Sequence, residues 1–183
     1  MPLHLRQPGS RKYHKIGYLH LDIKPENIFV LSQTKDYIKL IDFDNVVRKE
    51  ELGDESILIG CSKETSALEV RADKRSRISE ASDYYSIGAM VFGRIFKRGI
   101  HFNESKYAAR YDFGGLLEEY GDKKKELENE LSSFFKHTIC DFMKGRYASM
   151  EELKAQLEKI IKIARPVEEK IETAKNSKER RCA

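Results

Sequence analysis

The sequence predicts a single, mainly α-helical domain that carries one small β-hairpin. Short apolar runs flank a cluster of turn-forming residues at 32–36, which is typical of a hairpin. An apolar stretch at 85–95 is hydrophobic nearly all round, and the later segments 123–143 and 149–161 carry apolar side chains at spacings of three and four. A chain of 183 residues, 40% of them hydrophobic and 35% charged, is long enough to bury one core.

The first elements precede and form the hairpin. Residues 11–19 are expected to end a helical stretch, and the apolar runs 28–31 and 37–41 predict the two strands. Such a hairpin would hold Asn27 at one end of its first strand and Asp42 just beyond its second. We therefore expect both side chains to project to the same edge of the domain.

The remaining elements are predicted to be helical. Residues 44–82 are polar and rich in turn formers, which indicates an irregular surface segment, and Ser82 precedes the buried central helix. Segments 104–120 and 123–143 predict two further helices. Ser149, followed three residues later by a glutamate, predicts a capping box that opens the last helix.

Composition excludes several classes of protein. The net charge of +4 arises from 34 basic and 30 acidic side chains, and such mixed signs argue against a nucleic-acid surface. The cysteines Cys61, Cys140 and Cys182 are far apart and form no C-x-x-C motif, which favours a reducing cytosol without a zinc site. No apolar run is long enough to span a bilayer. We predict a cytoplasmic protein without membrane or nucleic-acid partners.

Two motifs carry the chemistry of the chain. Residues 20–27 read His-Leu-Asp-Ile-Lys-Pro-Glu-Asn, and Asp-Phe-Asp follows at 42–44 behind a short apolar run. Phosphoryl transfer needs a carboxylate that orients the acceptor, a cation on the moving phosphate and oxygen ligands for Mg²⁺. These residue types are supplied in one short stretch by Asp22, Lys24, Asn27 and Asp42.

The order and spacing of these motifs resemble the eukaryotic-like serine/threonine protein kinases, with their H-R-D-x-K-x-x-N catalytic loop and D-F-G metal loop. Further landmarks follow in family order. Residues 60–69 resemble the end of a kinase activation segment, 83–88 the D-x-W-S-x-G start of the buried helix F, and 146–153 the opening of the last lobe helix. Because these matches are ordered, a helical protein outside the family would need all of them by accident.

The resemblance implies a protein-kinase-like large (C-terminal) lobe at 13–163, preceded by an N-terminal arm at 1–12 and followed by a charged tail, frayed or disordered, at 164–183. A complete kinase places a small β-rich lobe first, with a Gly-rich loop, a strand-3 lysine and a helix-C glutamate. None of these precedes His20 in the chain. We therefore expect a fragment of a longer kinase, a half completed by a partner chain, or a lobe that no longer catalyses.

The resemblance also implies roles for the motif residues. Asp22 would orient the substrate hydroxyl and accept its proton, and Lys24 would neutralise charge on the γ-phosphate of ATP. Asn27 and Asp42 would hold Mg²⁺, which bridges the phosphates. The alternative for each is a helix-capping aspartate, a surface lysine or a turn residue.

Four other residues are implied to be structural. His20 would pack and hydrogen-bond beneath the metal loop, and Asp83 would anchor the backbone of the catalytic loop. Glu69 and Arg146 resemble the buried ion pair that ties the activation segment of a kinase to its lobe.

The chain departs from the family pattern at four places. Leu21 replaces the arginine of H-R-D, Asp44 the glycine of D-F-G, and Leu68 the proline of A-P-E. Cys61 or Ser62 stands where the family has a threonine that contacts the catalytic residues. None of these changes removes a metal ligand or the base.

We interpret the chain as a kinase-like domain of ATP:protein phosphotransferase type. Lys-Pro-Glu at 24–26 resembles the class that acts on serine and threonine. Activity is expected only if a small lobe completes it; the alternative is a kinase-derived interaction module without catalysis. A basic run fits either a preference for acidic substrates or a solvated loop: Arg71, Lys74, Arg75 and Arg77.

Overall fold

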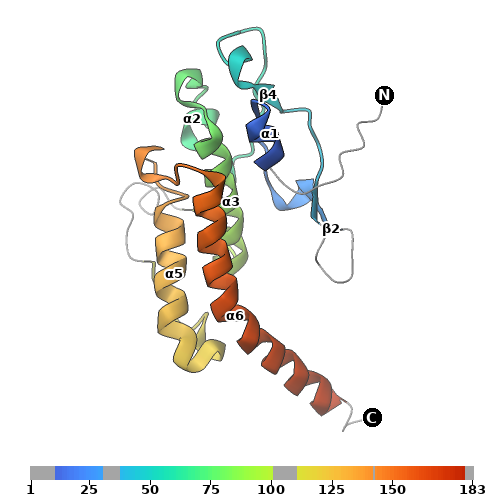
Figure 1. The fold of residues 1–183 in the computed structure, drawn as a ribbon, viewed down its shortest axis with the longest axis vertical. Helices are drawn as coiled ribbons and strands as arrows, with labels where there is room; N and C mark the ends of the chain where they lie inside the picture. The colour runs from blue at the N-terminus through green and yellow to red at the C-terminus, as the bar shows by residue number, and fades with distance from the viewer. Residues whose placement is uncertain (1–10, 31–37, 101–110, 142, 180–183) are drawn as a thin grey trace.

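The computed structural model describes residues 11–30, 38–100, 111–141 and 143–179. The longest elements are three helices, α3 (Glu80–Phe96), α5 (Lys124–Lys136) and α6 (Met150–Glu179), and the short elements of residues 11–19 and 47–77 lie near the N-terminal end of α3 (Figure 1). This arrangement confirms the predicted fold class, which is mainly α-helical with a small hairpin.

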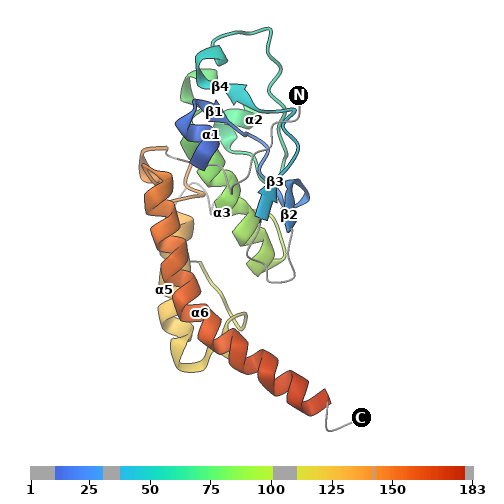
Figure 2. The ribbon, with the colours of Figure 1, turned by 45° about the vertical axis from the view of Figure 1, so that its right-hand side comes forward.

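The chain begins with one short helix and one short strand. Helix α1 (Arg11–Lys15) ends before Gly17, whose φ of +84° suits glycine at a helix end. Strand β1 (Tyr18–Leu19) then pairs antiparallel with β4 (Val47–Arg48) (Figure 2). The expectation that the helix continues to residue 19 was wrong, because a two-residue strand is too short to show a period in the sequence.

The predicted hairpin is confirmed. Strand β2 (Ile28–Val30) follows a single 3₁₀ turn, η1 (Pro25–Asn27), and pairs antiparallel with β3 (Ile38–Leu40), so that Ile28 lies opposite Leu40. The expected turn at 32–36 lies outside the described residues. Because Asn27 directly precedes β2 and Asp42 follows β3, both residues lie at the same end of the hairpin.

The segment before α3 is more ordered than its polar composition predicts. It contains the one-turn elements η2 (Lys49–Glu51), α2 (Leu68–Arg71) and η3 (Arg75–Arg77). Helix α3 begins after Ser79 and not after Ser82, which corrects the predicted start. Ser79 accepts a hydrogen bond from the backbone of Ala81, while the Ser82 hydroxyl accepts one from the backbone N–H of Ser79.

The helix predicted at 104–120 is not α-helical in the part that the structure describes, residues 111–120. Residues 101–110 lie outside the described part of the chain, 111–113 are irregular, and 114–117 form a turn that leads into η4 (Glu118–Lys123). Gly114 and Gly121 have positive φ values, and such glycines interrupt an α-helix. Helix α5 also ends at Lys136, earlier than the predicted residue 143.

The last helix begins where the sequence predicted. Ser149 accepts a hydrogen bond from the backbone N–H of Glu152 at 3.2 Å, and the Glu152 carboxylate accepts one from the backbone of Ala148 at 3.0 Å. Helix α6 continues through Pro166 to Glu179, so the described part of the expected charged tail is helical. In both ribbon views the C-terminal part of α6 extends away from the other helices (Figures 1 and 2).

The core lies where α3, α5 and α6 meet. Phe92 of α3 and Phe134 and Phe135 of α5 are fully buried, and the rings of Phe92 and Phe135 pack edge to face with centroids 5.4 Å apart. Gly88 allows close approach, since a Cβ there would collide with Thr138. Within the described residues, no helix combines the length and apolar character needed to cross a membrane.

Candidate functional site

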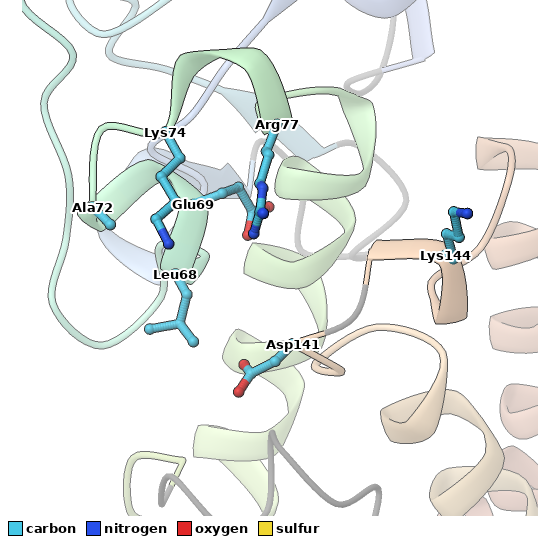
Figure 3. Close-up of a pocket in the computed structure, with 7 residues that line it drawn as sticks. All are labelled: Leu68, Glu69, Ala72, Lys74, Arg77, Asp141 and Lys144. Atoms are coloured by element: carbon cyan, nitrogen blue, oxygen red, sulfur yellow. The ribbon is translucent and has the colours of Figure 1, made fainter.

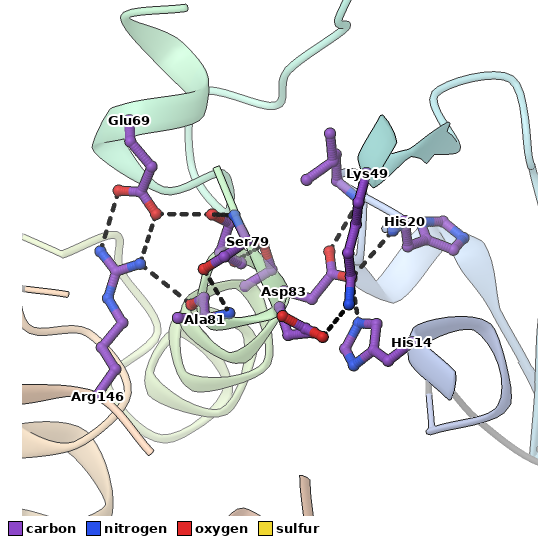
Figure 4. A network of polar contacts seen from close by, with 12 residues as sticks. His14, His20, Lys49, Glu69, Ser79, Ala81, Asp83 and Arg146 are labelled. Carbon is purple, nitrogen blue, oxygen red and sulfur yellow. Dashed lines mark hydrogen bonds and ion pairs between the residues drawn. The ribbon is translucent and has the colours of Figure 1, made fainter. Parts of the chain in front are cut away.

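The loop after β1 is fixed by a buried carboxylate on α3. Asp83 is fully buried, and its two oxygens accept hydrogen bonds from the backbone N–H of His20 at 3.0 Å and of Leu21 at 2.8 Å. The His14 ring contacts the same carboxylate at 2.7 Å (Figure 4). Leu21 has a φ of +61°, an uncommon conformation for a residue with a Cβ, and these bonds hold it there.

The Asp22 carboxylate is the centre of the site. It accepts hydrogen bonds from Lys24 Nζ at 2.7 Å, Ser62 Oγ at 2.6 Å, Asn27 Nδ2 at 3.2 Å and Asn45 Nδ2 at 3.3 Å. Burial alone raises the pKa of Asp22, but the bonds from Lys24, Ser62 and Asn27 outweigh burial and bring the pKa below its ordinary value. Asp22 is therefore an anion at neutral pH, suited to orient a hydroxyl group.

Asn27 connects this carboxylate to the hairpin. Its side-chain nitrogen also donates to the backbone oxygen of Asp22 at 2.9 Å, and its own backbone oxygen accepts from Ile41 at 2.8 Å. Because the amide nitrogen is used in this way, the side-chain oxygen is the atom left for a ligand.

Asp42 lies at the same end of the hairpin but is not bonded to Asn27. It is exposed, has a φ of +63°, and accepts a hydrogen bond from the backbone N–H of Asp44 at 3.3 Å. No group of three or more His, Cys, Asp or Glu side chains that could hold a metal occurs in the described ranges. Two protein oxygens would suit Mg²⁺, which keeps water and takes further ligands from phosphates.

The structure resolves one alternative and adds one residue. Ser62, and not Cys61, contacts Asp22, and its oxygen also accepts from Lys24 Nζ at 3.4 Å. Asn45 was missed by sequence reasoning, because nothing in its local pattern signals a contact with residue 22. A Cβ at Gly60 would collide with the Asn45 amide, so the glycine leaves room for this side chain.

His20 packs against Phe43 of the metal loop as expected, but its ring does not form the expected hydrogen bond. Its ring lies 5.7 Å from the ring of Phe43, which also packs on Tyr13 at 5.3 Å. Neither ring nitrogen of His20 has a hydrogen-bond partner of ordinary geometry, so the expected side-chain hydrogen bond is not seen. Burial lowers the pKa of this imidazole, which is therefore neutral at pH 7.

Glu69 and Arg146 form a buried pair on the other side of the α3 N-terminus (Figure 4). The guanidinium meets the carboxylate at 2.6 and 3.2 Å, and Ser82 Oγ donates to the same carboxylate at 2.8 Å. Burial alone raises the pKa of Glu69, but the bonds from Arg146 and Ser82 lower it below its ordinary value. Arg146 also donates to the backbone oxygen of Cys140 at 2.8 Å, which ties the segment before α6 to the pair.

We expect stability to fall on acidification in two stages. The folded pKa of His20 lies below 6.5, so the unfolded chain binds this proton first and stability is lost as the pH falls from 6.5. The stability due to Glu69 and Asp22 is complete above 4.5 and 3.8, respectively, and is lost as the pH falls through their lower folded values. Urea unfolding at a series of pH values measures both stages. His20→Leu should abolish only the upper stage, and an unchanged upper stage would contradict the assignment.

The chain is similar to known protein kinases. The protein kinase domain family matches residues 9–162. Smooth-muscle myosin light chain kinase of Gallus gallus is 34% identical over 84 residues, which cover 46% of this chain and 4% of that protein. Serine/threonine-protein kinase MRCK alpha of Mus musculus is 24% identical over 139 residues, 69% of this chain and 8% of that protein. The chain thus spans a small part of these relatives.

A solved structure supports the fold. The twitchin kinase region from C. elegans aligns with 80% of this chain and 25% of its own, with a TM-score of 0.50 and 21% sequence identity. The likeness therefore concerns the path of the backbone.

Proposed function

The chain belongs to the eukaryotic-like serine/threonine protein kinase family, and on that basis we propose that residues 13–163 are a kinase large lobe that orients a protein hydroxyl for phosphorylation. The observation that carries the proposal is the Asp22 carboxylate, bonded by a lysine, a serine hydroxyl and two amides. The Ser62 hydroxyl already donates to this carboxylate as a substrate serine or threonine would.

Lys24 supplies the cation that phosphoryl transfer requires. Its ammonium contacts the Asp22 carboxylate at 2.7 Å, and this bond raises the pKa of the lysine, which stays charged. A compact charge beside the acceptor carboxylate suits the oxygens of a γ-phosphate. In the proposal, Asp22 orients the acceptor and Lys24 stabilises the moving phosphate.

Asn27 and Asp42 are proposed to hold Mg²⁺ together with ATP. Members of this family generally use both, and the two residues offer oxygen donors at one end of the hairpin. The metal would neutralise phosphate charge beside the carboxylates of Asp42 and Asp44, which otherwise repel a nucleotide.

Transfer also needs groups that cover the phosphates, and positioning and electrostatics supply nearly all of the rate in this reaction class. We propose that a small lobe from an upstream segment or a partner chain provides them, and that these 183 residues alone transfer phosphate negligibly. The substrate would be a protein with a serine or threonine acceptor. A cytoplasmic location, suggested by the cysteine spacing, and the limits at residues 13 and 163 belong to the same proposal.

A non-catalytic interaction module is the second candidate. The side chains of Phe29 and Phe43 are 53% and 42% exposed, respectively, and both lie on or beside the hairpin. Exposed aromatic side chains of this kind suit an interface. Asp44, in place of the family glycine, adds charge and rigidity to the metal loop.

Calorimetric titration of Mg·ATP separates the two candidates. We expect weak binding that requires Mg²⁺, falls by about tenfold or more in Asp42→Asn, and barely changes in Asp22→Asn, because Asp22 orients the acceptor and holds no metal. Asp44→Asn is the matched control, since it removes a neighbouring charge but no proposed ligand. Binding without metal, or equal losses at residues 22 and 42, would contradict these roles. No nucleotide binding at all would favour the interaction module.

A further inference from the structure

A pocket of about 540 Å³ lies between the α2–η3 segment and the segment that joins α5 to α6 (Figure 3). Leu68, Ala72, Lys74 and Arg77 line one wall, and Asp141 and Lys144 line the other. Glu69 also lines the pocket, whereas Asp83, which holds the catalytic loop, lies on the other side of the α3 N-terminus (Figure 4). The pocket is therefore separate from the candidate active site.

The basic side chains near this pocket fall into two groups. Arg71 donates to the backbone oxygen of Lys63 at 3.1 Å, and Arg75 pairs with Asp73 at 3.0 Å. Both arginines therefore already bind partners within the fold. Lys74 and Arg77, from the same run, form no ion pair with a side chain in the described part of the chain. Both are exposed at the pocket.

Lys144 adds a third positive charge from a distant part of the sequence. It is exposed on η5 (Met143–Gly145) and, like Lys74 and Arg77, has no ion pair among the described residues. Of the acidic lining residues, Glu69 is neutralised by Arg146 within the buried pair. Asp141 is the other acidic lining residue, so the positive charges of Lys74, Arg77 and Lys144 outnumber the negative charges at the pocket.

Part of the pocket wall is apolar. Leu68 is half-buried and Ala72 is exposed, and both line the pocket beside Lys74 and Arg77. No aromatic side chain is among the described lining residues, so the stacking platform that single-stranded nucleic acid uses is missing there. Apolar and cationic side chains that line the same pocket match an aliphatic side chain flanked by carboxylates.

We propose that this pocket docks an acidic peptide segment of another protein, with a leucine-like side chain on Leu68 and Ala72 and neighbouring Asp or Glu carboxylates on Lys74, Arg77 and Lys144. Charge complementarity selects the partner, as at other interfaces with a basic rim. The inference goes beyond phosphoryl transfer and requires neither ATP nor the Asp22 site.

Fluorescence anisotropy with a labelled Glu-Glu-Leu-Glu-Glu peptide tests the proposal. Lys74→Gln/Arg77→Gln should weaken binding by about fivefold, since two solvent-exposed ion pairs are lost, and Lys144→Gln should weaken it less. Lys97→Gln/Lys125→Gln is the matched control, because both lysines are exposed, neither lines the pocket and the same charge is removed. Salt should weaken binding to the wild type more than to the pocket variant.

A Gln-Gln-Leu-Gln-Gln peptide controls for the carboxylates. Equal binding of the two peptides, equal losses in the pocket and control variants, or no binding of the acidic peptide would each overturn the proposal. Thermal unfolding by circular dichroism should give the same midpoint for both double variants. Because no nucleotide is present, failure here leaves the Mg·ATP titration as an independent test of the active site.

Discussion

Arg146→Met is expected to lower the free energy of unfolding by about 3–5 kcal/mol, because it leaves the buried Glu69 carboxylate without its cation. The guanidinium of Arg146 also donates to the backbone oxygens of Cys140 at 2.8 Å and Ala81 at 3.1 Å. Its Cζ lies 4.9 Å from the centroid of the Tyr85 ring. The substitution therefore weakens contacts among α2, α3 and the segment before α6.

Urea unfolding of two further variants makes this test specific. Glu69→Met/Arg146→Met should lose less stability than Arg146→Met alone, because no unpaired charge remains buried. Lys154→Met breaks the exposed pair of Lys154 with Glu158 and should cost below about 0.5 kcal/mol. In Arg146→Met, burial should raise the pKa of Glu69, so that acidification through this value reduces the loss. A loss that does not change with pH would contradict the unpaired-charge explanation.

The elements that sequence predicted are those whose signal is local. The turn cluster and the apolar runs on both sides of it predicted the hairpin, and a stretch hydrophobic nearly all round predicted α3. Ser149 and Glu152 predicted the start of α6, because the residues of a capping box lie within four consecutive positions. By contrast, β1 and β4 contain only two residues each and show no hydrophobic periodicity. The start of α3 was predicted wrongly because Ser82, like Ser79, is a residue type that caps helices.

The parts of the site that sequence missed depend on the path of the chain. Asn45 reaches Asp22 across 23 positions, and the choice of Ser62 over Cys61 required the backbone of the activation segment. Lys144 joins Lys74 and Arg77 only because the segment before α6 folds against α2 and η3. The ion pair between Glu69 and Arg146, which are 77 positions apart, was predicted only from the family resemblance.

Asp83→Ala is expected to cost about 3–5 kcal/mol, since it leaves the buried backbone N–H groups of His20 and Leu21, and the His14 ring, without their acceptor. Each buried polar group that loses its partner costs about 1–3 kcal/mol. Ser86→Ala is the matched control on the same helix. It removes the buried hydroxyl that donates to the backbone oxygen of Ser82 at 3.2 Å and should cost about 1 kcal/mol or less.

Hydrogen exchange distinguishes this loss from a general weakening of α3. The φ of Leu21, +61°, is maintained by the bond from its N–H to Asp83, so removal of the carboxylate should release the loop that carries Asp22. In Asp83→Ala the amides of His20 and Leu21 should therefore exchange faster than those of α5, whereas in Ser86→Ala they should stay protected. Asp83→Asn, which retains one acceptor oxygen, should fall between the two. If both amides stay protected in Asp83→Ala, the carboxylate is not what holds the catalytic loop.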